Sequence, residues 1–71
     1  MEQYLNLSGK SGVEAYEIVE TCISVKFEKN VYTYSYNLAG KNNVDTMKDL
    51  ARAGKGLNSY INKNVKNLYD K

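Results

Sequence analysis

The sequence predicts an α+β domain, in which a three-stranded antiparallel sheet is followed by two helices packed on one of its faces. Two observations carry this prediction. Between residues 22 and 36, apolar and polar side chains alternate with a period of two, which is typical of half-buried strands. From residue 44 onward, apolar side chains recur at spacings typical of amphipathic helices. The expected order is therefore β-β-β-α-α, and 71 residues is the length of one small domain.

An N-terminal arm is expected ahead of this domain. The stretch Ser-Gly-Lys-Ser-Gly at residues 8–12 is polar and glycine-rich, which favours a flexible connection. We therefore expect residues 1–12 to form an arm that is flexible or weakly docked, and residues 13–71 to form the single domain. Three apolar side chains of the arm are able to contact the domain: Tyr4, Leu5 and Leu7.

The first predicted strand runs from Val13 to Glu20, where β-branched and aromatic residues are frequent. Its inward face stays open at this stage, because apolar residues occur on both faces of a regular strand. They are Tyr16 and Ile18 on one face, and Val13, Ala15 and Val19 on the other.

The next two strands form a predicted hairpin around a turn at Lys29-Asn30, since asparagine tolerates the positive φ of tight turns. With this turn, an apolar row lies opposite three tyrosines: Phe27 opposite Tyr32, Val25 opposite Tyr34, and Ile23 opposite Tyr36. Directly opposed residues project to the same face, which the helices must cover. We therefore expect the tyrosines to be mainly core residues, not an open platform for stacking bases. A three-residue loop would move them to the other face.

The first predicted helix presents one apolar stripe to the sheet. Asn42 or Asn43 is expected to cap its N-terminus, Asp45 to lie in its first turn, and Gly54 to end it. The stripe consists of Val44, Met47, Leu50 and Ala51.

The second predicted helix runs from about Ser59 to Asn67 after a glycine-rich turn. Its asparagines make it a weak helix in isolation, so packing against the sheet must stabilise it. Its apolar stripe consists of Ile61, Val65 and Leu68, with Leu57 just before it.

The composition excludes several kinds of site. One cysteine and no histidine rule out an intrachain disulfide and a Cys/His zinc site. The acidic residues are scattered singly, so we expect no metal ion and no other cofactor. No apolar run approaches the length of a membrane helix, and a free thiol fits a reducing compartment. We therefore expect a soluble, cytoplasmic protein without a membrane partner.

Catalysis is not expected. Without histidine, the chain lacks the Ser/His/Asp and Cys/His sets of nucleophilic enzymes, and it has no paired carboxylates. The stretch AGKGLN at residues 53–58 lacks the spacing of a phosphate-binding loop and follows a helix, so we interpret it as a turn. The sequence predicts a non-enzymatic binding module.

The charge is distributed unevenly between the two halves of the chain. Residues 1–35 carry three Lys against five Glu, whereas residues 36–71 carry seven Lys/Arg against three Asp. The basic half permits weak, salt-sensitive contacts with RNA phosphates, although a solvated helical face explains it as well. The candidate phosphate contacts lie around the turn between the helices and on the last helix: Arg52, Lys55, Lys63 and Lys66.

Several short motifs in a fixed order resemble the KTSC domain, a small module named from the C-terminus of some lysyl-tRNA synthetases. The resemblance covers roughly residues 12–69 and departs from the family in the hairpin turn, which usually contains a glycine and one more residue. It implies that the motif residues are mainly core. They are Val25 and Phe27, then Tyr32 and Tyr34 around Thr33, then Ile61, Asn62, Val65 and Tyr69, with Lys66 in the same closing stretch.

The family has no established activity, and its attachment to a tRNA synthetase implies RNA binding only by association. Combined with the basic helices, the resemblance predicts a stand-alone KTSC-like module that binds RNA weakly through phosphates. The alternative is a protein–protein interaction or homodimerisation module with no nucleic-acid role, which would use exposed strand edges.

Overall fold

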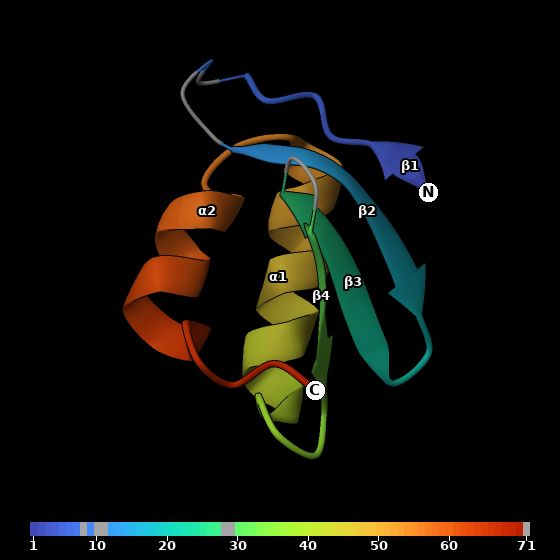
Figure 1. The fold of residues 1–71 in the computed structure, drawn as a ribbon, viewed down its shortest axis with the longest axis vertical. Helices are drawn as coiled ribbons and strands as arrows, with labels where there is room; N and C mark the ends of the chain where they lie inside the picture. The colour runs from blue at the N-terminus through green and yellow to red at the C-terminus, as the bar shows by residue number, and fades with distance from the viewer. Residues whose placement is uncertain (8, 10–11, 28–29, 71) are drawn as a thin grey trace.

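The computed structural model describes residues 1–7, 9, 12–27 and 30–70 of the chain, in which a sheet is followed by two helical segments (Figure 1). The elements are β1 (Glu2–Gln3), β2 (Val13–Val19), β3 (Cys22–Phe27), β4 (Asn30–Ser35), α1 (Lys41–Ala53), α2 (Leu57–Tyr60) and the π-helical η1 (Ile61–Val65).

The predicted α+β class is confirmed, but the predicted number of strands is wrong. Within the described residues, four strands form one antiparallel sheet in the order β1-β2-β3-β4, where the sequence predicts three. The additional strand comes from the N-terminal arm, where Glu2 and Gln3 pair with Tyr16 and Ala15 of β2. Two residues are too short for any periodicity, so the sequence pattern does not reveal this strand.

The core lies between the sheet and the helical segments, which pack on the same side of it (Figure 1). Each fully buried aliphatic side chain stabilises the fold by about 1.5–3 kcal/mol relative to an exposed position. None of the helices in the described ranges is long and apolar enough to cross a membrane. The largest side chains that are completely buried are Ile23, Val25, Val44, Met47, Leu57 and Val65.

A bulge in β2 decides which of its side chains face the helices. The pairing of β2 with β3 shifts by one residue between Val13 and Ala15, so Glu14 is an extra residue in this strand. The extra residue reverses the alternation beyond it. Val13 and Tyr16 are therefore both buried, although a regular strand would place them on opposite faces.

The β3–β4 hairpin pairs two residues away from the predicted register. Val25 lies opposite Tyr32 instead of Tyr34. Because the shift is even, the tyrosines remain on the face that carries the apolar row of β3. Tyr34 is buried there, and Tyr32 and Tyr36 are half-buried against the core.

The shift follows from the place of the turn. Asn30 is the first residue of β4 and pairs with Phe27, so the predicted turn at Lys29-Asn30 is wrong. Lys29 itself lies outside the described residues.

The N-terminus of α1 differs from the predicted cap. The helix begins at Lys41, its N-cap residue is Gly40, and no side chain bonds to its first N–H groups. Neither Asn42 nor Asn43 is therefore the N-cap. The side-chain Nδ2 of Asn43 instead donates a hydrogen bond of 2.8 Å back to the carbonyl of Ala39.

Gly54 ends α1, as the sequence predicts. It has a left-handed backbone conformation with φ of 78°, and its N–H donates to the carbonyls of Leu50 and Ala51. A Cβ atom at this position would lie 2.6 Å from the Cβ of Leu5. Glycine is thus required both by the backbone conformation and by the close passage of the N-terminal arm.

The last helix starts earlier than predicted and changes type along its length. α2 continues into the π-helical η1, and the residues Leu57, Ile61 and Val65 recur every four positions and are all buried. The helical segment ends at Val65. The predicted inward position of Leu68 is wrong, because this side chain lies beyond the helix and is 41% exposed. Tyr69 packs against the core instead.

The N-terminal arm contributes a core residue. Tyr4 is only 3% exposed, its N–H donates to the carbonyl of Glu14, and its hydroxyl accepts a bond of 3.4 Å from the N–H of Leu57. The N–H of Leu7 also donates to the carbonyl of Gly54. The arm is thereby attached both to the sheet and to the start of α2.

A polar network attaches α1 to the sheet. The hydroxyl of Tyr36 donates to Oδ1 of Asp45 at 2.7 Å, and Lys41 Nζ donates to Oδ2 at 3.0 Å. Lys48 is buried, and its Nζ donates to the carbonyl of Glu20 and to the hydroxyl of Tyr36. Asp45 lies past the first turn of α1, so it acts through these bonds and not at the helix terminus.

Replacing Tyr4 with Ala should lower the free energy of unfolding by about 3 kcal/mol or more, because a buried aromatic ring is lost. Urea-induced unfolding followed by circular dichroism measures this change. Leu7→Ala, at an exposed position of the same arm, is the control and should cost about 0.5 kcal/mol or less. Equal effects of the two substitutions would show that the arm adds nothing specific to the core.

Asp45 should make the stability of the fold depend on acidic pH. The hydrogen bond from Tyr36, followed by that from Lys41, lowers the pKa of Asp45 below its ordinary value of 3.8. A lowered pKa in the folded state contributes stability above pH 3.8, which is lost as the pH falls further. When Asp45→Asn is unfolded with urea at a series of acidic pH values, its free energy of unfolding should not show this loss. Asp49→Asn, which removes an equal charge from an exposed side chain, should retain it. Identical pH profiles for Asp45→Asn and the unsubstituted protein would contradict the assignment.

Candidate functional site

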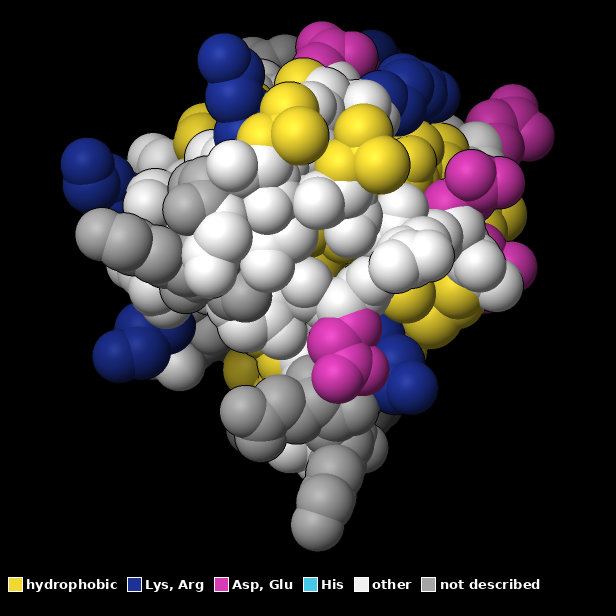
Figure 2. All heavy atoms as spheres, turned by 90° about the horizontal axis from the view of Figure 1, so that it is seen from above, with side chains coloured by type: hydrophobic (Ala, Val, Ile, Leu, Met, Phe, Trp, Pro, Cys, Tyr) yellow, Lys and Arg dark blue, Asp and Glu magenta, His cyan; other side chains and the backbone are white. Residues whose placement is uncertain are grey.

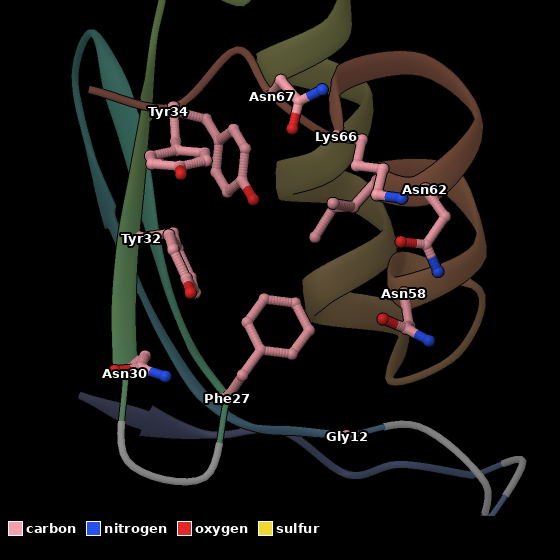
Figure 3. A pocket seen from close by; sticks show the side chains of 11 residues that line it. Gly12, Phe27, Asn30, Tyr32, Tyr34, Asn58, Asn62, Lys66 and Asn67 are labelled. Carbon is pink, nitrogen blue, oxygen red and sulfur yellow. The ribbon is translucent and has the colours of Figure 1, made fainter. Parts of the chain in front are cut away.

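An open pocket of about 550 Å³ lies where the β3–β4 hairpin faces the last helix (Figure 3). It is formed by segments far apart in the sequence, from the start of β2 to the residues that follow η1. The lining residues are Gly12, Phe27, Asn30, Tyr32, Tyr34, Asn58, Ile61, Asn62, Lys66, Asn67 and Tyr69.

One wall of the pocket is aromatic. The alternation of β4 places Tyr32 and Tyr34 on the face that the helices cover, and Phe27 ends β3 beside them. Tyr32 meets Tyr69 edge-to-face, with ring centroids 4.7 Å apart, and it contacts Phe27 in the same way at 5.9 Å. Figure 3 shows that Phe27 and Tyr32 project from the hairpin toward the helical side. Both rings are half-buried, so each keeps part of its surface accessible.

The opposite wall is polar. Asn58, Asn62 and Lys66 come from the helical side at a constant spacing of four residues, which places them along one face of the α2–η1 segment (Figure 3). In the part of the chain that the structure describes, none of these three side chains has a hydrogen-bond or ion-pair partner.

Two asparagines elsewhere in the helices are bonded. Asn43 accepts a hydrogen bond from the Tyr60 hydroxyl at 2.7 Å, and Asn64 donates to the carbonyl of Tyr60 at 3.2 Å. The asparagines beside the pocket therefore differ from those that stabilise the fold.

Tyr34 places a hydroxyl at the inner end of the pocket. The residue is 2% exposed, and burial raises its pKa to about 12, with the neighbouring Tyr32 and Tyr69 adding to the increase. The group is thus a neutral O–H at physiological pH, able to donate and accept. Within the described residues this hydroxyl has no hydrogen-bond partner, in contrast to those of Tyr36 and Tyr60.

The residues of the KTSC-like motif meet at this pocket. Val25 and Val65 are fully buried in the core and do not line it. The other six motif residues line it, and they come from three separate stretches of the chain: Phe27, Tyr32, Tyr34, Ile61, Asn62 and Tyr69.

The four candidate phosphate-binding cations do not gather at one place. Lys66 lines the pocket, whereas Lys63 is exposed on η1 and Lys55 is exposed between the helices. Arg52 pairs with Asp49 at 3.6 Å and lies beside β1 and β2, at the other edge of the sheet from β4. On the face that Figure 2 shows, Lys and Arg side chains are spaced around the outline of the molecule.

Sequence reasoning missed Gly12, Asn30, Asn58 and Asn67 as lining residues. The spacing of four that joins Asn58 to Asn62 and Lys66 is a signal visible in the sequence. The pattern alone did not show that this polar stripe would face the tyrosines, because that depends on how the last helix packs.

The pocket offers binding groups and no evident catalytic set. The described lining residues supply aromatic rings, amides, one ammonium group and hydroxyls, and none of them carries a carboxylate, thiol or imidazole. Across the described ranges, no group of three or more His, Cys, Asp or Glu residues is placed to hold a metal ion.

Comparisons with protein-family models, with curated proteins and with solved structures find no match for this chain. The similarity to the KTSC domain therefore depends on the order of the short motifs, and the family assignment stays a prediction. The pocket is defined by the geometry of the chain itself.

Replacing Tyr34 with Phe should remove a phenolate that forms at about pH 12 in an alkaline titration followed by ultraviolet absorbance. A raised pKa in the folded state contributes stability below pH 10, which is lost as the pH rises toward 12. The stability of Tyr34→Phe should therefore fall less than that of the unsubstituted protein as the pH rises from 10 to about 12. The same titration in urea is the control, because burial no longer acts there. Superimposable titrations of the two folded proteins would contradict the environment described for Tyr34.

Proposed function

We propose that this chain is a small KTSC-like, non-enzymatic binding module whose ligand is RNA. One observation carries the proposal: six residues of the KTSC-like motif and Lys66, a cation predicted to contact phosphates, line the same pocket. Aromatic rings together with a nearby cation are the groups that proteins use to hold single-stranded nucleic acid.

The charge distribution supports a single-stranded ligand held by few contacts. Lys66 and Lys63 lie on or next to η1 and are exposed, so both are accessible to phosphates. Arg52 lies near the β1 edge of the sheet, so it cannot contribute to the same phosphate-binding surface as Lys63 and Lys66. Binding should therefore be weak and sensitive to salt. The proposal places the protein in the cytoplasm, where its lone cysteine stays reduced.

The interaction-module alternative has less support. Strand addition needs an open sheet edge, and at the β4 edge the N–H of Asp70 already donates to the carbonyl of Thr33 at 2.6 Å, which leaves the β1 edge for such a partner. Ser35 also donates to the carboxylate of Asp70. Sedimentation of the protein tests the homodimer version, and a monomer at high concentration would argue against it.

Labelled single-stranded RNA and tRNA should bind at roughly 10–100 micromolar protein in low salt, and the affinity should fall at moderate salt. Fluorescence polarisation measures both quantities. Lys63→Glu/Lys66→Glu should abolish binding, because it removes two cations and adds repulsion. Lys26→Glu alters charge on the sheet face away from the helices and should leave most of the affinity. Absence of binding in low salt, or equal losses in the two variants, would rule out the proposal.

A further inference from the structure

The pocket carries the chemistry of a nucleotide site. We propose that it takes up one unstacked nucleotide of the RNA, with the base between the aromatic wall and the amides of the last helix, and the phosphate on Lys66. This inference rests on the proposed function and adds the unit of ligand that is recognised and the groups that recognise it.

The aromatic wall suits the flat face of a base. Phe27 at the end of β3 and Tyr32 within β4 both line the pocket, and both are half-buried. Their edge-to-face contact keeps the two rings from stacking on each other, and both point toward the helical side of the pocket (Figure 3). Contact between a base and an aromatic side chain stabilises single-stranded complexes without selecting one base.

The amides suit the polar edge of a base. Each asparagine side chain offers one acceptor and two donors, which matches the alternating donors and acceptors of a nucleobase. Asn58 and Asn62 have no protein partner among the described residues, so no internal hydrogen bond has to be broken on binding. Rotation of the amide group by 180° exchanges its donor and acceptor positions. We therefore expect the pocket to bind different bases with similar affinity.

The hydroxyl of Tyr34 provides a further polar group at the inner end. It belongs to a side chain that is 98% removed from solvent, and it has no partner in the described part of the chain. Among the described residues no buried side-chain nitrogen or oxygen lacks a partner, so this hydroxyl oxygen keeps contact with the pocket and is available to a ligand that enters it. A base edge that enters past the aromatic wall supplies this partner.

The single cation suits one phosphate. Among the described residues, Lys66 is the cation that lines the pocket, and no acidic side chain lines it beside Lys66. The same absence disfavours a cationic ligand, and the unbonded amides disfavour a purely apolar one. A planar, neutral ring joined to one anionic group fits these three conditions together.

Titration of the isotope-labelled protein with AMP, followed by NMR, tests the inference, with adenosine and inorganic phosphate as parallel ligands. AMP should shift the backbone signals of Tyr32, Asn62 and Lys66, adenosine should shift them more weakly, and phosphate alone should not reproduce the pattern. UMP should behave like AMP. Shifts of equal size with phosphate alone would overturn the inference, since the base would then contribute nothing.

Substitutions at exposed positions separate the pocket from general charge. Lys66→Ala should weaken AMP binding about tenfold, which corresponds to one hydrogen bond to a charged group, and Asn62→Ala should weaken it roughly fivefold. The controls are Lys26→Ala, on the sheet face away from the helices, and Asn64→Ala, on the same helical segment but outside the lining, and both should change the affinity less than twofold.

The two proposals fail in different ways. RNA binding that persists unchanged in Lys66→Ala and Asn62→Ala would overturn the nucleotide pocket and leave the RNA-binding function standing. AMP binding in the pocket without any affinity for single-stranded RNA or tRNA would overturn the RNA-binding function and, with it, the assignment of the ligand as an RNA residue. Absence of binding to either ligand would overturn both.

Discussion

The pairing of β3 with β4 is the constraint on which the rest of the structure depends. Ile23 lies opposite Tyr34 and Val25 opposite Tyr32, so one face of the hairpin is apolar and aromatic while the other is polar. Water disfavours such a face, and the helices cover most of it with side chains such as Met47. The uncovered end of the same face is the wall of the pocket. Core and candidate site are therefore two parts of one surface.

A chain of 71 residues buries only a small core, and this protein supplements it with contacts outside the regular pattern. Tyr4 adds a ring from the N-terminal arm, and the buried Lys48 links α1 to the β2–β3 turn through the carbonyl of Glu20. Each polar atom involved has a partner, so the desolvation of these groups is compensated. Neither contact is made between the apolar faces of two amphipathic elements, so the periodicity of apolar residues does not reveal them.

The residues of the last helix have opposing effects on its stability. Its asparagines are weak helix formers, and those beside the pocket satisfy no group within the described chain. The buried row of Leu57, Ile61 and Val65 stabilises the segment from its other side. Positions where local preference conflicts with the fold are expected at functional or strained sites. Asn64, which bonds within its own segment, follows the structural pattern instead.

Alternation by itself determined the two strands of the hairpin and the shared face of the tyrosines, because an even shift of register preserves that face. Gly54 likewise determined the end of α1, because its left-handed conformation is a local property. The tertiary structure decided the register, the bulge in β2, the added strand β1 and the outward position of Leu68. It also decided that the polar stripe of the last helix faces the aromatic wall. Periodicity shows which side of an element is buried, whereas the neighbour that it meets depends on contacts between residues far apart in the chain.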